Sequence, residues 1–206
     1  ATETVGTAVT VSGSSYRVAA AYDVNAQKVV VVFRNAGNSD QGTAIVGTTS
    51  GLSISFDGKT VFETGATDDT SVAYDANAQK SVIAYRDGGN SNYGTAIVAT
   101  VSGDTISFGS AVVFESANSE EMTVVYDAYA QKVVIFYIDQ GNSAYGTAIV
   151  GTVSGTSISF GTAVVFESAT VDHISAAYDS DAQKTVTAYR DQGNSSYGTA
   201  IVGTVS

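Results

Sequence analysis

A 52-residue repeat constrains the fold of this chain more than any other feature of its sequence. The dipeptide Tyr-Asp begins at Tyr22, Tyr74, Tyr126 and Tyr178, and Gly-Asn begins at Gly37, Gly89, Gly141 and Gly193. A constant period of about 50 residues is typical of propellers, solenoids and arrays, in which each repeat is one supersecondary unit. We therefore predict one domain, residues 1–206, built from four copies of the same unit.

Each copy contains four runs of apolar and β-branched residues separated by turn residues. In the third copy the runs are MTVVYD, KVVIFYID, GTAIVGTVS and TSISFGTAVVFES, and the turns are DAYAQK, QGNSAY and SGTS. β-Branched and aromatic runs favour strands, while Asn, Asp and Gly favour the hairpin turns between them. Gly161 inside the fourth run predicts a bend or a split. The sequence predicts an all-β chain of four-stranded antiparallel sheets.

The two ends of the chain favour a ring over a linear array. The last copy stops at Ser206 without a fourth strand, and residues 2–12, TETVGTAVTVS, are similar to residues 157–168. A linear array would leave an unpaired edge, whereas a ring leaves none if residues 2–12 complete the last sheet. We predict a four-bladed β-propeller whose N-terminal strand closes the C-terminal blade. Its blades comprise about residues 13–64, 65–116, 117–168, and 169–206 plus 2–12.

A propeller also explains where small and large side chains occur. The first strand of each copy is rich in small residues, as in VAAAY at 18–22, which suits an innermost strand. Aromatic residues would fill the wider spaces between blades. These are Tyr22, Tyr74, Tyr126, Tyr178, Phe56, Phe62, Phe108, Phe114, Phe160 and Phe166. A monomer is expected, and the alternative is a pair of chains that exchange end strands to form one eight-bladed ring.

Two resemblances bear on this interpretation. The chain resembles hemopexin-like domains, which are closed four-bladed propellers, in architecture only, and it carries no hemopexin sequence motif. The repeat YDANAQKSVIAYRDGGNSNYGTAIV at 74–98 resembles repeats in surface and tail-fibre proteins of marine bacteria and their phages. That resemblance covers the whole chain and implies an extracellular location or one on a virion or cell surface, without naming an activity.

Composition excludes several classes of partner and site. The net charge is −11 and the nine Lys and Arg residues are scattered, which argues against nucleic-acid binding. No apolar run approaches the roughly 20 residues that span a membrane, so no membrane insertion is expected. The absence of cysteine excludes disulfides and thiolate metal sites. The single histidine, His173, aligns with Arg17, Asp69 and Glu121, and we predict neither catalytic residues nor a required cofactor.

Acidic residues just before the innermost strands form the first candidate site. They are Asp68, Asp69, Glu120, Glu121 and Asp172. If they surround one mouth of the ring, their oxygens could hold a hard cation such as Ca²⁺. Arg17 could neutralise part of such a ring. The alternatives are solvated rim charges and a pair of carboxylates of the glycosidase type.

The loops between the second and third strands form the second candidate site. Their shared residues are Asp87, Asn90 and Tyr93, then Asp139, Asn142 and Tyr145, then Asp191, Asn194 and Tyr197. Asp and Asn can hydrogen-bond to sugar hydroxyls and a tyrosine ring can stack on a pyranose. The first copy departs from this pattern with Asn35 and Gln41. The alternative is that these residues only build a turn.

We therefore predict a non-enzymatic binding or adhesion module that engages carbohydrate on a surface glycan through repeated loops, since several weak sites on one rigid ring would add avidity. The alternative from another class is a structural spacer or oligomerising domain of a larger repeat protein. An enzyme acting on glycosides is the third hypothesis.

Overall fold

The computed structural model describes residues 2–206, and they form one antiparallel sheet of 15 strands with three short 3-10 helices. The prediction of an all-β chain is confirmed. Within these residues, no helix is both long and apolar enough to cross a membrane.

The strands fall into four units that follow the four repeats. Unit 1 contains β1 (Ser15–Asp23), β2 (Lys28–Asn35), η1 (Ala36–Asn38), β3 (Gln41–Ser50) and β4 (Ser53–Phe56). Unit 2 contains β6 (Lys80–Asp87), β7 (Tyr93–Ser102) and β8 (Thr105–Phe108). Unit 3 contains β10 (Lys132–Asp139), η2 (Gln140–Asn142), β11 (Tyr145–Ser154) and β12 (Ser157–Phe160). Unit 4 contains β14 (Lys184–Asp191), η3 (Gln192–Asn194) and β15 (Tyr197–Gly203).

Three long strands connect successive units. They are β5 (Thr60–Asp75), β9 (Val112–Asp127) and β13 (Val164–Asp179). The first half of β5 pairs with β3 as the outer strand of unit 1, and its second half pairs with β6 as the innermost strand of unit 2. The break predicted at Gly161 is also present, because β12 ends at Phe160 and β13 begins at Val164.

The Tyr-Asp dipeptide marks a turn that all four repeats build in the same way. In unit 3 the Asp127 carboxylate accepts hydrogen bonds from the backbone N–H groups of Tyr129 and Ala130, at 3.0 and 2.9 Å. Gln131 follows with a φ of 57°, in the left-handed region. An Asx turn followed by a left-handed residue closes a tight hairpin, which explains why the repeated text is so regular here.

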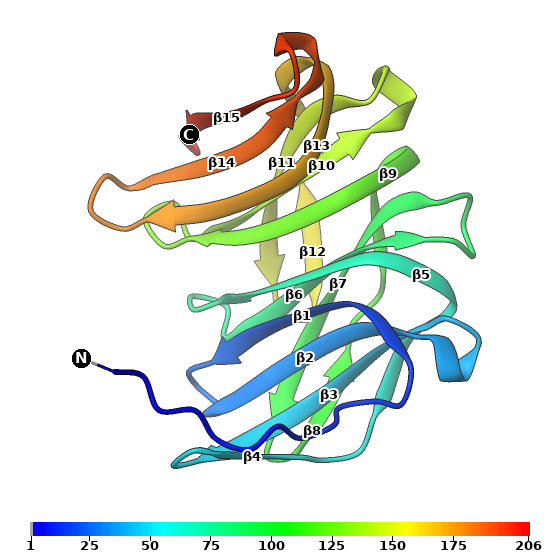
Figure 1. Ribbon diagram of the computed structural model, residues 1–206, viewed down its shortest axis with the longest axis vertical. Helices are drawn as coiled ribbons and strands as arrows, with labels where there is room; N and C mark the ends of the chain where they lie inside the picture. Colours follow the sequence, from blue (N-terminus) through cyan, green and yellow to red (C-terminus); the bar gives the residue numbers. More distant parts are fainter. Residues whose placement is uncertain (1) are drawn as a thin grey trace.

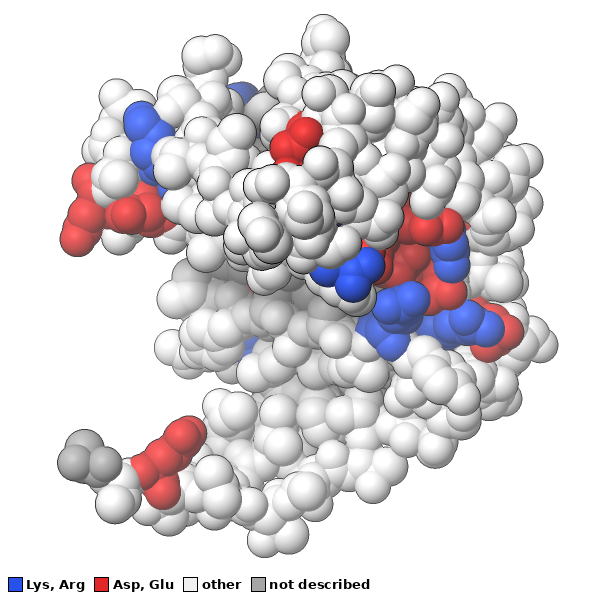
Figure 2. All heavy atoms as spheres, turned by 45° about the horizontal axis from the view of Figure 1, so that its top comes forward, with Lys and Arg blue, Asp and Glu red and all other residues white. Residues whose placement is uncertain are grey.

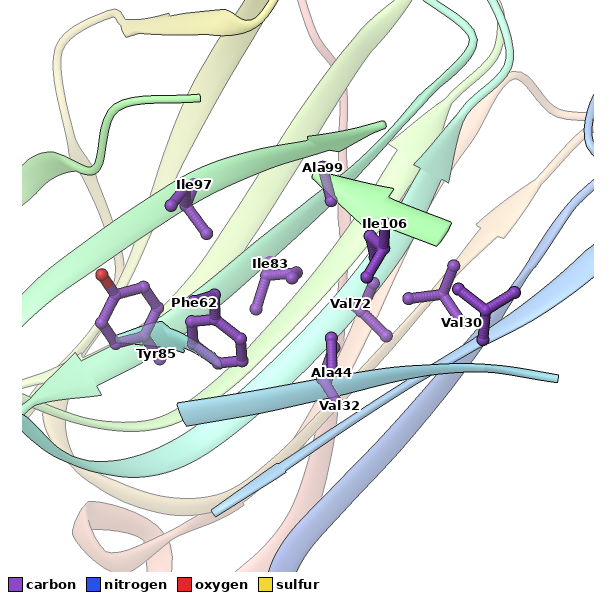
Figure 3. Close-up of a cluster of buried hydrophobic side chains, with 11 residues drawn as sticks. Val30, Val32, Ala44, Phe62, Val72, Ile83, Tyr85, Ile97, Ala99 and Ile106 are labelled. Atoms are coloured by element: carbon purple, nitrogen blue, oxygen red, sulfur yellow. The ribbon is translucent and has the colours of Figure 1, made fainter. Parts of the chain in front are cut away.

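The core lies between successive units. The cluster between units 1 and 2 joins Val30 and Val32 of β2 to Ile83 and Tyr85 of β6, and Phe62 packs in the same cluster (Figure 3). Rings of adjacent units pack at similar geometry, with Phe62–Tyr85, Phe114–Tyr137 and Phe166–Tyr189 centroids each 5.2 Å apart. The prediction that phenylalanines fill the spaces between units is confirmed for these contacts.

The Tyr-Asp tyrosines have a second role besides the predicted packing, which Tyr126 shows by its contact with the core between units 2 and 3. The hydroxyl oxygens of Tyr126 and Tyr178 accept hydrogen bonds, each 3.1 Å long, from the backbone N–H groups of Asn77 and Tyr129 in the preceding unit. Within residues 2–206, Tyr22 has no such neighbour and is 51% exposed. Tyr126 and Tyr178 therefore fasten units 3 and 4 to the hairpin of the unit before each of them.

The predicted closure of the ring is absent from the structure. Residues 2–10 form no regular secondary structure, β15 pairs only with β14, and the sheet is not closed. Figure 1 shows the two termini on the same side of the molecule with an open gap between them. A physical reason lies in the sequence of the segment, where Val5 and Val11 replace Phe160 and Phe166 of the matching segment and offer less apolar surface to anchor a strand.

Candidate functional site

A β-bulge interrupts the innermost strand of every unit at the same place. The register between β5 and β6 shifts between Asp68 and Ser71, and the other three units show equivalent shifts. In each bulge one residue that is not glycine has a positive φ: Arg17 at 53°, Asp69 at 49°, Glu121 at 49° and His173 at 54°. Bulges re-aim side chains, and left-handed backbone in such residues carries strain.

These four strained residues meet at one central cavity. The cavity has a volume of about 500 Å³. It is lined by Arg17, Val18, Asp69, Thr70, Glu121, Met122, His173 and Ile174, so each unit contributes its strained residue and the one after it. This volume falls within the range of ordinary small-molecule sites. The four units therefore surround a common space even though the sheet is open.

Polar contacts at the cavity join one unit to the next. The Thr70 hydroxyl donates to the carbonyl oxygen of Arg17, and the Glu121 carboxylate accepts from the backbone N–H of His173. Arg17 Nε lies 3.3 Å from Asp69 Oδ1, and His173 Nδ1 lies 3.8 Å from Glu121 Oε1. The four units therefore place different groups at the same backbone position around the cavity: a guanidinium, two carboxylates and an imidazole.

Accessibility differs sharply among these charged groups. The Asp69 side chain is 3% exposed, whereas that of His173 is 73% exposed. Burial raises the pKa of Asp69, and this effect exceeds the opposing influence of Arg17 and Arg86. Arg17, Glu121 and His173 remain open to the cavity, so they are the groups that a bound molecule would meet first.

The five acids predicted to surround one mouth divide into two sets. Asp69 and Glu121 line the cavity, whereas Asp68, Glu120 and Asp172 do not. These three acids contact arginines, with distances of 2.8 Å from Asp68 to Arg86, 3.1 Å from Glu120 to Arg86 and 2.7 Å from Asp172 to Arg190. Asp69 is shared between the two sets, because it also lies 3.3 Å from Arg17 and 3.6 Å from Arg86. The division arises because the bulge turns consecutive side chains in different directions.

Asp68 is the centre of the arginine-bound set. Its carboxylate also contacts Arg17 at 3.0 Å and Arg34 at 3.1 Å. Burial opposes ionisation of Asp68, but the backbone N–H of Asp69 and the adjacent Arg86 hold its pKa below the ordinary value. Figure 2 shows basic and acidic side chains gathered in a mixed patch on this face. In residues 2–206 no three acids or histidines come together as a metal-binding group, so the expected convergence on Ca²⁺ is not seen.

The repeated loops place their shared residues in three different settings. Asp87, Asp139 and Asp191 are buried. Asp139 and Asp191 each accept a hydrogen bond of 3.1 Å from the backbone N–H of the loop asparagine, Asn142 or Asn194, and so cap the short helices η2 and η3. These aspartates build the turn and point away from solvent.

The asparagines and tyrosines of the loops are more accessible. Asn90, Asn142 and Asn194 are exposed, whereas Tyr93 and Tyr145 are half-buried because they pair with the outer strand that follows. Tyr197, which has no such strand, is 63% exposed. The candidate loop sites therefore retain an exposed asparagine in each copy and a fully accessible tyrosine only in the last.

The central cavity was only partly visible in the sequence. The sequence shows that Arg17, Asp69, Glu121 and His173 occupy equivalent positions, but it does not show that they line one cavity. A left-handed backbone is usually predicted from glycine, and none of these four residues is glycine. Tyr85, Tyr137 and Tyr189 were not singled out either. Each donates a hydrogen bond to a glutamate of the preceding unit, at 3.3, 3.2 and 3.1 Å.

The chain matches no protein-family model, and no curated protein is similar to it in sequence.

Proposed function

We propose that this chain is a non-enzymatic binding module of the β-propeller type, with the central cavity as its ligand site. Four blades around one axis would correspond to the four units, as the repeat implies. The observation that carries the proposal is that four strained residues, equivalent in position but different in chemistry, line one cavity: Arg17, Asp69, Glu121 and His173. Residues that follow in each copy, such as Tyr-Asp and the Ala-Gln-Lys of the first turn, are the same in all four repeats, so these four positions stand out by their variation.

The charge pattern indicates the class of ligand. The cavity offers a carboxylate at Glu121, a guanidinium at Arg17 and an imidazole at His173, while the Asp69 carboxylate is buried beside Arg17. A small polar molecule with an amino group for Glu121 and hydroxyl or carboxylate groups for Arg17 and His173 complements that arrangement. Amino sugars and amino acids have this chemistry. Presentation on a cell or virion surface would suit such a module, as would adhesion to glycans that contain amino sugars.

A thermal-shift panel of amino sugars, amino acids and neutral sugars tests this proposal. We expect amino compounds to raise the melting temperature of the wild-type protein but not that of Glu121→Gln. Glu120→Gln is the matched control, because Glu120 adjoins Glu121 in sequence but pairs with Arg86 outside the cavity. A panel without any shift, or equal shifts for wild type and Glu121→Gln, would refute the assignment.

Carbohydrate contact at the repeated loops is the second candidate function. It is favoured by the exposed amide side chains of Asn90, Asn142 and Asn194, which recur at equal spacing along the chain. Glycan-array binding that survives Glu121→Gln but falls with Asn142→Ala would assign recognition to the loops. Binding that is lost only with Glu121→Gln would assign it to the cavity.

A further inference from the structure

The outer edge of β15 differs from the same edge in every other unit. The equivalent strands β3, β7 and β11 each pair on that side with the long strand that leads into the next unit. Within residues 2–206, β15 has only β14 as a partner, and Val202 is 62% exposed. An unpaired edge with exposed apolar side chains is a template for strand addition.

A glycine on β15 marks the place that an incoming side chain would fill. At Gly42, Gly94 and Gly146 a phenylalanine ring of the following outer strand lies where a Cβ would be, at 2.4, 2.6 and 2.5 Å from that position. At the equivalent Gly198 no atom lies within 4 Å. Unit 4 therefore has the space for an anchoring side chain but nothing that occupies it.

The N-terminal segment, residues 2–12, has the complementary half of this interface. Gly6 lies against the carbonyl of Leu52 in the β3–β4 turn, and Gly109 lies in the same way against Thr156 in the β11–β12 turn. Val11 packs with Phe33, as Phe166 packs with the equivalent Tyr189. The segment thus lies along unit 1 as the outer strand of a preceding unit would, and within residues 2–206 it pairs with no strand.

The two half-interfaces belong to opposite ends of one molecule. Figure 1 shows β15 and the N-terminal segment on either side of the open gap, and Figure 2 shows the space-filled molecule deeply hollowed between its two ends. Val5 is 79% exposed and Val9 is also exposed, so the free side of the segment is as unsatisfied as the free edge of β15. Neither half can complete the other within the molecule while the gap is open.

We infer that the edge of β15 binds the N-terminal segment of a second copy of this chain. The segment then lies between unit 1 of its own molecule and unit 4 of the next, and the stacking of units continues from one copy into the other. Such a head-to-tail contact closes as a ring or continues as a chain of copies, according to the rotation between them. This inference does not depend on the ligand site proposed above.

The internal repeat gives the register of the new strand pair. Thr147 lies opposite Val165 and Ala148 opposite Val164 in unit 3. Aligning Val11 with Phe166 therefore places Thr10 of one copy opposite Thr199 of the other. Cysteines at directly opposed positions of antiparallel strands lie close enough to form a disulfide. The natural chain has no cysteine, so a pair introduced there reports on this contact alone.

Oxidation of the double variant Thr10→Cys/Thr199→Cys tests the inference. We expect covalent dimers or longer ladders on a non-reducing gel. An internally cross-linked monomer would overturn the inference, because it would mean that the ring closes within one chain. A failure to cross-link would also overturn it, because neither partner would then reach β15.

Sedimentation velocity provides a second test that needs no cysteine. We expect the wild-type protein to self-associate as its concentration rises, and Gly198→Val to weaken association by about tenfold or more, since valine fills the space for Val11. Ala76→Val is the matched control, because Ala76 is exposed in the β5–β6 turn of unit 2 and the first copy carries Val24 at the equivalent position. A wild type that stays monomeric, or a Gly198→Val variant that associates normally, would refute the inference.

Discussion

Exchanging the residues at one repeated core position is expected to change stability in opposite directions in two units. Ile135 on β10 is fully buried among the apolar side chains between units 2 and 3. The equivalent residue on β14 is Thr187, which lines an apolar cavity of about 180 Å³ between units 3 and 4. The same strand position is therefore filled in one unit and underpacked in the other.

The magnitudes follow from the atoms exchanged. Ile135→Thr removes the equivalent of two buried methylenes, about 1.6 kcal/mol, and buries a hydroxyl at a further cost of about 1 to 3 kcal/mol if it finds no partner. Thr187→Ile gains up to about 1.6 kcal/mol and loses about 1 kcal/mol with the hydrogen bond from Thr187 Oγ1 to the Ser175 carbonyl, which is 3.3 Å long. The net stabilisation should be at most about 0.6 kcal/mol.

Urea unfolding followed by circular dichroism measures both variants against the wild type. Thr187→Val is the control that removes the hydroxyl without adding length, so it isolates the hydrogen-bond contribution. The packing argument fails if Thr187→Ile destabilises the protein by more than about 1 kcal/mol while Ile135→Thr costs less than that. Equal slopes of free energy against urea would show that the comparison concerns stability alone.

Two further changes probe single contacts. Tyr126→Phe should cost about 1 kcal/mol in urea unfolding because it removes the hydrogen bond from the Asn77 N–H, whereas Tyr22→Phe should cost almost nothing; equal costs would contradict the fastening role. Burial, and then Glu63, raises the pKa of Asp87 above 3.8, so ionisation of Asp87 destabilises the folded state. Asp87→Asn should therefore gain stability over wild type as the pH rises from about 3 to about 7, and a constant difference between the two proteins would contradict this.

Much of the fold was predictable because it depends on local chemistry. Strand runs with β-branched residues, the Asp-capped turn at Asp127 and the break at Gly161 are encoded within a few residues of each other. Fourfold repetition reinforces each signal, and the placement of Phe62 and Phe114 between units follows from the same pattern. The predicted closure of the ring was wrong, because the similarity of residues 2–12 to residues 157–168 does not extend to Phe160 and Phe166, which are Val5 and Val11 in the N-terminal segment.

For the candidate sites, the positions of the residues in the repeat could be predicted from the sequence, but the directions of their side chains could not. The predicted loop aspartates lie at the ends of β6, β10 and β14, and whether Asp139 points inward to cap η2 or outward to a ligand depends on the backbone of the turn. Of the two neighbouring acids at the bulge, Asp69 lines the cavity and Asp68 does not, although both contact Arg17 and Arg86. Which acid reaches the cavity depends on the backbone of the bulge and cannot be predicted from the order of the residues.

The sequence by itself determined the strands, their turns and the fourfold division of the chain, because these depend on side-chain shape and on hydrogen bonds between residues a few positions apart. Only the tertiary structure decided which side chains share the central cavity and which edges remain unpaired. The left-handed backbone at Arg17, Asp69, Glu121 and His173 turns these side chains towards one space. Contacts between residues more than 50 positions apart, such as Thr70 with Arg17 and His173 with Glu121, hold the units around it, and no short run of residues encodes them.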